Sequence, residues 1–289
     1  MTALKVRRIR FDFRDPVPFL WNPQNPALSV GGNVLSIMAI GFERFIVSVV
    51  RQAMPLISDP AVVAEADAFL RQEAQHSSAH QQHVRSLVRS YPGLSGTLDA
   101  VIADYRKLDE TTALPFKLAY IADIEATFTP AFTLLLDHEQ TLFRPGDDRI
   151  ASMFLWHFVE EIEHRSSALR IYDAVVPSKA LRLRALPAVV SHLAQQTQLV
   201  TTGFEAHVPA VDRMGSVRSS RRLRRKAPAL LGSVPLRDKL AAIRGICAAQ
   251  IPGHEPEFER LPEFADKWFV RYERGEDVVR WYWSERDGS

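Results

Sequence analysis

The sequence contains a single cysteine, Cys247, in 289 residues. One cysteine excludes an intramolecular disulfide and any metal site built from several thiolates. The first 177 residues also contain almost no stretch in which apolar and polar residues alternate, which argues against a β-sheet there. Apolar residues recur instead at helical spacing over long segments, so we predict an all-α protein.

The chain also lacks a strong excess of either charge. Lysine and arginine total 36 against 34 for aspartate and glutamate, a formal charge of +2. This balance gives no reason to expect a nucleic-acid partner. The N-terminus, MTALKVRRIRFDFRD, has no apolar core of the signal-peptide kind. The apolar run from Ala27 to Phe42 is interrupted and shorter than the roughly 20 residues that span a bilayer. We therefore predict a cytoplasmic protein.

The expected organisation has three parts. Residues 1–28 include DPVPFLWNPQNP and indicate an extended N-terminal arm. We expect residues 29–177 to form a core of four long helices, and residues 178–289 to form additional C-terminal helices that pack on it. The expected long helices cover 34–54, 60–90, 114–143 and 148–176, with a short connecting helix at 97–110, later helices at 178–205 and 236–250, and a basic segment at 212–227.

Each long helix carries a glutamate where its pattern calls for an apolar residue. In chain order the helices supply Glu, Glu-x-x-His, Glu and Glu-x-x-His. Residues i and i+3 lie on one side of a helix, about 4.5 Å apart along its axis. Such a pair can hold one metal ion or bridge two adjacent ions. The predicted metal ligands are Glu43, Glu73, His76, Glu125, Glu161 and His164.

Charge balance favours two metal ions at this cluster. A carboxylate in a helix-bundle core costs several kcal/mol in lost hydration unless a cation compensates it. Two divalent ions cancel the charges of four glutamates. Oxygen and imidazole ligands without thiolate suit iron or manganese better than structural zinc. We therefore predict two ions, with iron as the main expectation and manganese or zinc as alternatives.

The order of these motifs resembles that of the ferritin-like di-iron carboxylate proteins. More narrowly, the chain resembles a bacterial family catalogued as predicted metal-dependent hydrolases. The stretches VRRIRFDF, GFERF, QEAQHSSAH and WHFVEEIEHRSSALRIYD carry this resemblance, over roughly residues 5 to 175. It implies a helical bundle that binds two metal ions.

The ligand pattern and the family name favour different chemistry. Hydrolytic zinc sites on helices usually contain His-Glu-x-x-His, whereas the nearest stretch here is the five residues from His157 to Glu161. Our main prediction is a di-iron oxidase or oxygenase that activates dioxygen and acts on a small, apolar organic substrate, with a reductase as partner unless the substrate supplies the electrons. One alternative is a hydrolase that uses a metal-bridging hydroxide, and another is a non-enzymatic iron-binding protein. A homodimer is left open.

Several residues lie near the predicted ligands. His80 and His83 share a stripe with His76, and His157 lies one turn before Glu161. They enlarge the metal shell, hold a carboxylate or move protons, unless they are partly exposed helix residues. Tyr120 is a candidate radical carrier or a core residue. We interpret the basic run 218–226 as a solvated loop, and contact with an anionic membrane surface is the alternative.

Overall fold

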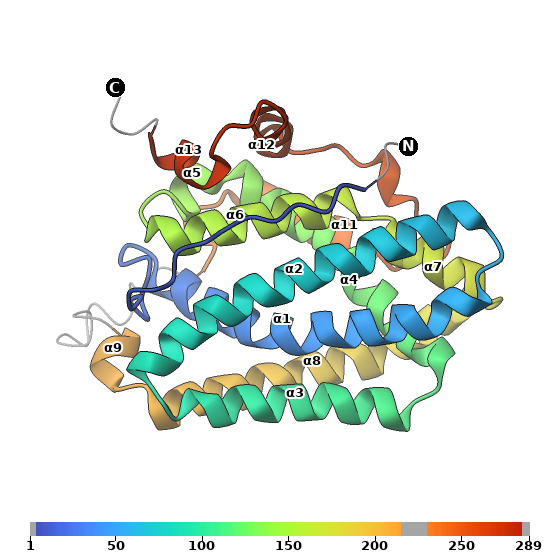
Figure 1. The fold of residues 1–289 in the computed structure, drawn as a ribbon, viewed down its shortest axis with the longest axis horizontal. Coiled ribbons are helices and arrows are strands. Elements are labelled where there is room, and N and C mark those ends of the chain that lie inside the picture. Colours follow the sequence, from blue (N-terminus) through green and yellow to red (C-terminus); the bar gives the residue numbers. More distant parts are fainter. Residues whose placement is uncertain (1–3, 215–229, 285–289) are drawn as a thin grey trace.

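A computed structural model describes residues 4–214 and 230–284 of the chain (Figure 1). Every regular element in these two ranges is a helix, and no strand occurs in them. The prediction of an all-α protein is confirmed.

Five helices enclose the interior in which the predicted ligands lie. They are α1 (Pro26–Ala53), α2 (Pro60–Ser90), α4 (Leu114–Asp137), α6 (Asp148–Glu163) and α7 (Ser167–Val175). The helices α1 and α2 pack against each other along their length, and α4 contacts α1, α6 and α7. This arrangement brings segments that are more than 100 residues apart in the sequence around one core.

The start of α1 differs from the prediction by eight residues. The helix begins at Pro26, because the side chain of Asn25 accepts a hydrogen bond from the backbone N–H of Leu28 at 3.1 Å and proline suits the first helical position. The predicted start at residue 34 was wrong, since Gly31 and Gly32 weaken the helical pattern without breaking the helix. The arm therefore ends at residue 25.

Two predicted helices are interrupted in the structure. The segment predicted as 114–143 ends at Asp137 and is followed by a short helix, α5 (Glu139–Leu142). The segment predicted as 148–176 is broken after Glu163 and resumes at Ser167. His164 lies in this break, at the C-terminal end of α6.

The predicted connecting helix is a full helix, α3 (Leu94–Thr111), which packs against α1 and α8. Most of the basic segment 212–227 lies outside the described residues. The remaining elements are α8 (Ala180–His207), α9 (Ala210–Met214), α11 (Leu236–Ala249), α12 (Glu263–Glu273), α13 (Val278–Ser284) and two 3-10 helices, Met54–Leu56 and Pro256–Phe258.

Residues beyond 178 are attached to the core by polar as well as apolar contacts. A buried ion pair joins Arg182 of α8 to Asp123 of α4, with Nε to Oδ1 at 3.0 Å. The helix α11 packs on α4, and the Ser152 hydroxyl of α6 donates to the Val279 carbonyl of α13 at 3.0 Å. In Figure 1, α12 and α13 lie over α6.

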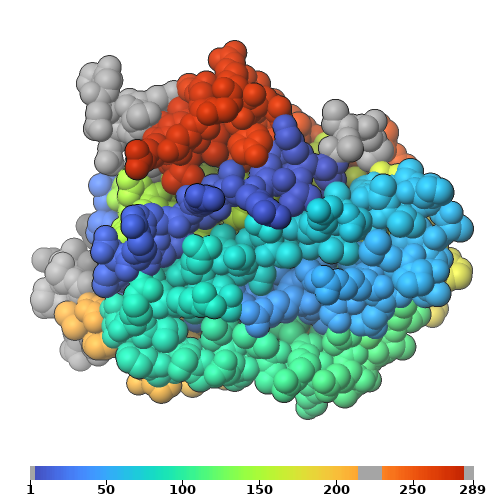
Figure 2. Space-filling view, viewed as in Figure 1, coloured from blue at the N-terminus to red at the C-terminus, as the bar shows by residue number. Residues whose placement is uncertain are grey.

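The N-terminal arm fills a seam between two parts of the molecule. It runs along α6 in Figure 1, and in Figure 2 it lies between α2 and the C-terminal helices. Phe11, Phe13 and Trp21 are buried along it. The arm is therefore part of the core packing.

The segment Pro26–Leu56 is long and apolar enough to cross a membrane by length and composition, contrary to our expectation from the run at 27–42. However, 67% of its apolar window is buried inside the protein. A core helix surrounded by other helices has this property, so the segment alone is weak evidence for a membrane span.

Two helical glycines should respond oppositely to alanine. A Cβ atom at Gly41 would lie 2.6 Å from Cδ2 of Tyr105, where α1 and α3 meet, whereas no atom lies within 4 Å of a Cβ at Gly96 in α3. We expect Gly41→Ala to lower the free energy of unfolding by about 1–3 kcal/mol through overpacking. Gly96→Ala should raise it by about 0.5–1 kcal/mol, because alanine is the better helix former. Urea denaturation of both variants measures this, and equal effects would contradict the close approach of α1 to α3.

Candidate metal centre

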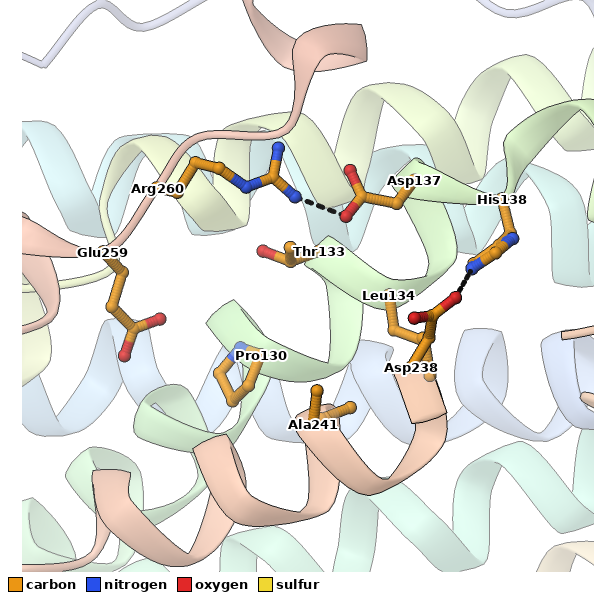
Figure 3. A pocket seen from close by; sticks show the side chains of 10 residues that line it. Pro130, Thr133, Leu134, Asp137, His138, Asp238, Ala241, Glu259 and Arg260 are labelled. Carbon is orange, nitrogen blue, oxygen red and sulfur yellow. Dashed lines mark hydrogen bonds and ion pairs between the residues drawn. The ribbon is translucent and has the colours of Figure 1, made fainter. Parts of the chain in front are cut away.

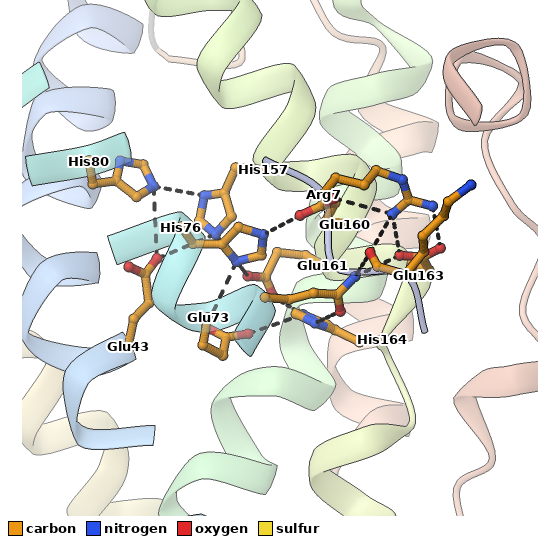
Figure 4. Close-up of polar contacts among 12 residues, drawn as sticks. Arg7, Glu43, Glu73, His76, His80, His157, Glu160, Glu161, Glu163 and His164 are labelled. Carbon is orange, nitrogen blue, oxygen red and sulfur yellow. Dashed lines mark hydrogen bonds and ion pairs between the residues drawn. The ribbon is translucent and has the colours of Figure 1, made fainter. Parts of the chain in front are cut away.

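The six residues that the sequence selects lie together in the interior. Each is at most 2% exposed. The helix α1 carries the first of them, α2 the next two and α4 the fourth, while the last two lie at the end of α6. Figure 4 shows the side chains from α1, α2 and α6 facing one another. These six are Glu43, Glu73, His76, Glu125, Glu161 and His164.

One group of ligand atoms is rich in carboxylates. Glu73, Glu125, Glu161 and His164 each place one ligand atom within 4.8 Å of the others. His164 Nε2 lies 2.9 Å from Glu161 Oε2, 3.4 Å from Glu73 Oε1 and 3.7 Å from Glu125 Oε2. We call these four residues the carboxylate group; they are close enough to share one ion.

A second group adjoins the first. Glu43, Glu73 and His76 also place ligand atoms within 4.8 Å of one another. His76 Nδ1 lies 3.2 Å from Glu161 Oε1 and 3.8 Å from Glu73 Oε2. Glu73 and Glu161 therefore lie between the two groups, where carboxylates can bridge two ions.

Two more histidines border the centre. His80 and His157 form a further group with Glu43, and His157 forms another with His76 and Glu161. Both rings are buried, which excludes the alternative that they are partly exposed helix residues. His83 is fully buried as well, but none of the groups includes it, and its Nδ1 pairs with the Ser36 hydroxyl at 2.9 Å.

Neighbouring side chains fix which nitrogen of each histidine faces the centre. His76 Nε2 lies 3.0 Å from Glu160 Oε2, which leaves Nδ1 directed at the carboxylates. His164 Nδ1 lies 3.2 Å from Gln72 Oε1, which leaves Nε2 directed at them. Metal-binding histidines are commonly oriented in this way, through the nitrogen that does not bind the ion.

The N-terminal arm contacts the residues that orient these histidines through Arg7. Its guanidinium is buried and pairs with Glu160 at 3.2 Å and with Glu163 at 2.6 Å (Figure 4). The same guanidinium lies over the ring of Phe269, with its Cζ 5.0 Å from the ring centroid, and over the ring of Tyr272 at 5.3 Å, both in α12. Arg7 thus joins the arm, α6 and α12 behind His76.

Sequence reasoning missed these supporting residues. Gln72 and Glu160 each precede a predicted ligand directly, so their polar character in a buried helix was a usable signal. Arg7 offered no such signal, because its partners lie more than 150 residues away in the sequence.

Tyr120 does not belong to the centre. Its hydroxyl pairs with His192 Nδ1 of α8 at 2.7 Å and lies 3.4 Å from the Tyr105 hydroxyl of α3. Asp104 holds the other nitrogen of His192 at 2.8 Å. Of the two interpretations of Tyr120, the structure fits a core residue, because its side chain faces α3 and α8 and not the glutamates.

Burial and mutual repulsion dominate the electrostatics of the glutamates. Burial, followed by the charges of neighbouring glutamates, raises the pKa of Glu43 and Glu125 well above the usual range, and it raises the pKa of Glu73 as well. Burial also acts to raise the pKa of Glu161, but His164 and His157 outweigh it, so the pKa lies well below the usual range. Such a cluster favours protons or metal cations as counter-charges.

The residues fit bound metal ions. Within the described part of the chain, no hydrogen bond reaches either carboxylate oxygen of Glu43 or of Glu73, Oε1 of Glu125, or Nδ1 of His76, although all are buried. Buried polar atoms are normally paired, and leaving a charged one unpaired costs several kcal/mol. A cation among these atoms would supply the missing partner.

A cavity of about 620 Å³ lies elsewhere, between α4, α11 and the segment around Arg260 (Figure 3). Its lining includes Pro130, Thr133 and Asp238 but none of the residues of the centre.

The helices and their buried carboxylate–histidine centre define an all-α protein able to hold metal ions. Comparison with family models leads to a narrower class: residues 5–239 match the family described as "Predicted metal-dependent hydrolase". The chain therefore belongs to this family. Searches of curated proteins and of solved structures found no significant match.

The buried His83 should make stability depend on pH. Burial lowers its pKa from 6.5 to about 3. Between these two pH values the imidazole of His83 is protonated in the unfolded chain but neutral in the folded protein. The contribution of neutral His83 to the free energy of unfolding is therefore fully present above pH 6.5 and is lost as the pH falls towards 3. Between pH 7 and pH 4.5 we expect the free energy of unfolding to fall by roughly 2–3 kcal/mol more in the wild type than in His83→Gln. Denaturant titrations at several pH values measure this, and parallel pH profiles would contradict it.

Proposed function

We propose that this protein is a dinuclear metal-dependent hydrolase. The observation that carries the proposal is the set of unpaired, buried carboxylate oxygens in two adjoining groups that share Glu73. In this proposal the carboxylate group holds one ion, and Glu43 with His76 holds the other. Glu73 and Glu161 contribute to both.

A ferritin-like arrangement is part of the proposal. Such bundles supply single glutamates from two helices and Glu-x-x-His pairs from two others, all directed inward. Here α1 and α4 carry the single glutamates, and α2 and α6 carry the pairs, with His164 at the end of α6. The order and inward direction of these residues support the assignment.

Bound divalent ions would act as Lewis acids, polarising the group under attack and lowering the pKa of a coordinated water. The protein's own residues hold the ions and orient the imidazoles. Glu160 keeps His76 Nδ1 directed inward, and Gln72 does the same for His164 Nε2. The rings of Phe69 and Trp156, which lie edge-on to His164 and His76, exclude bulk water from the histidines.

The family description favours one of the two chemistries considered for the sequence. It supports hydrolysis, which was the alternative there, over the main prediction of an oxidase or oxygenase. Oxidation with iron is the second candidate, favoured by a donor set of four carboxylates and histidines without thiolate. The cytoplasmic location, the reductase, the homodimer and the membrane-surface contact stay predictions.

Metal content tests the proposed ligands directly. We expect the wild type to bind about two ions per chain, and Glu161→Gln to lose most of both, because Glu161 lies between the two groups. Glu139→Gln, at a partly exposed site on α5 away from both groups, should bind as the wild type does. Elemental analysis after dialysis gives the counts. Undiminished metal in Glu161→Gln would end the assignment.

Turnover distinguishes hydrolysis from oxidation. With zinc or manganese bound and oxygen excluded, we expect hydrolysis of activated esters, amides or phosphates, and a loss of at least about a hundredfold in Glu161→Gln, because a Lewis acid contributes several kcal/mol to such reactions. Product release is followed optically. Oxygen uptake by the ferrous protein, with no anaerobic hydrolysis across the panel, would favour the oxidative candidate instead.

A further inference from the structure

A line of polar contacts continues from the proposed centre along α2 and α6. His157 Nε2 lies 2.8 Å from Glu161 Oε1, and His157 Nδ1 lies 2.9 Å from His80 Nε2. His80 Nδ1 in turn pairs with the Ser36 hydroxyl at 3.0 Å. The six-residue motif includes neither of these two histidines, although both rings lie against the centre (Figure 4).

The distances from these rings to Glu43 do not suit hydrogen bonds. Glu43 Oε1 lies 3.6 Å from His157 Nε2 and 3.9 Å from His80 Nε2, beyond the range of an N–H···O bond. Two atoms that each lie about 2.1 Å from a shared ion can be up to roughly 4.2 Å apart. The distances from Glu43 Oε1 to the two ring nitrogens therefore suit atoms that bind the same ion. Neither oxygen of Glu43 makes a hydrogen bond to another described residue.

The Ser36 hydroxyl influences which nitrogen of His80 carries the lone pair. This hydroxyl contacts two imidazole nitrogens, His80 Nδ1 and His83 Nδ1, and can donate its single proton to only one of them. If the hydroxyl donates to His83, its oxygen accepts from His80 Nδ1–H, and the lone pair of His80 is then on Nε2. That nitrogen is the one nearest Glu43, and an ion bound there would take the place of its contact with His157 Nδ1. The hydroxyl therefore stands in the place where metal-binding histidines usually have their outer partner.

We propose that His80 and His157 are direct ligands of the ion held at Glu43. The inference rests on the proposed function, which places an ion there, and adds two ligands to it. A third ion is not required, because two divalent cations already balance four glutamates. His80 and His157 act as neutral imidazoles in this role, because a ring nitrogen needs a free lone pair to bind an ion.

The two metal positions are then chemically different. The ion in the carboxylate group has one histidine among three glutamates, whereas the ion at Glu43 has three histidines beside its glutamates. Imidazole suits zinc, copper, nickel and iron, and carboxylate suits magnesium and manganese. The centre should therefore accept two unlike metals, with zinc preferring the position at Glu43.

X-ray absorption at the zinc edge tests the inference, because imidazole scattering counts histidines per ion. With two zinc ions bound, the six-residue motif supplies two histidines, an average of one per ion. The proposal supplies four histidines, an average of two per ion. We expect two in the wild type, one in the double variant His80→Gln/His157→Gln, and a loss of about tenfold or more in the affinity for one of the two zinc ions in that variant.

A matched control is available on the same helix. His83→Gln changes a histidine that is equally buried and pairs with the same hydroxyl, but belongs to none of the groups, so it should keep two imidazoles per ion. The single variants His80→Gln and His157→Gln should each give an intermediate count, even if the double variant does not fold. Two zinc ions with one imidazole each in the wild type would overturn this inference alone. A wild type that binds no zinc would overturn the proposed function.

Discussion

The accumulation of four carboxylates in a closed apolar interior is the constraint on which the rest of this structure depends. Like charges at this distance repel, and each has lost its hydration. The helices cannot pack as they do unless cations or protons compensate these charges. Histidines, a buried arginine and amide side chains accordingly surround the glutamates, and each constrains the direction of a group nearer the centre.

The cluster itself could be predicted because its members follow helical spacing. A glutamate in an apolar stripe is visible in one dimension, and four of them on four long helices imply that they meet. The partners behind them could not be predicted equally well. Arg7 and Glu160 meet only because the arm runs along α6, a fact of tertiary packing. The role of Tyr120 stayed open because sequence proximity to Glu125 does not specify which neighbour its ring contacts.

Helix boundaries were harder to predict than helices, for a similar reason. The pattern over residues 26–33 is diluted by two glycines, yet the Asn25 cap and the packing around this segment keep it helical. The opposite error occurs between α6 and α7, where the helix breaks although the sequence pattern there is continuously helical. Local propensity is a weak constraint in both places, and tertiary contacts decide the outcome.

The position of Arg7 has a consequence for the order in which the protein matures. This guanidinium is held on one side by glutamates of α6 and on the other by aromatic rings of α12. The ribosome makes α12 long after it has made all six glutamate and histidine residues of the centre. A nascent chain can therefore gather these residues before the layer that orients His76 is complete. The layer that orients His76 is accordingly complete only when α12 has been made and packs against the guanidinium of Arg7.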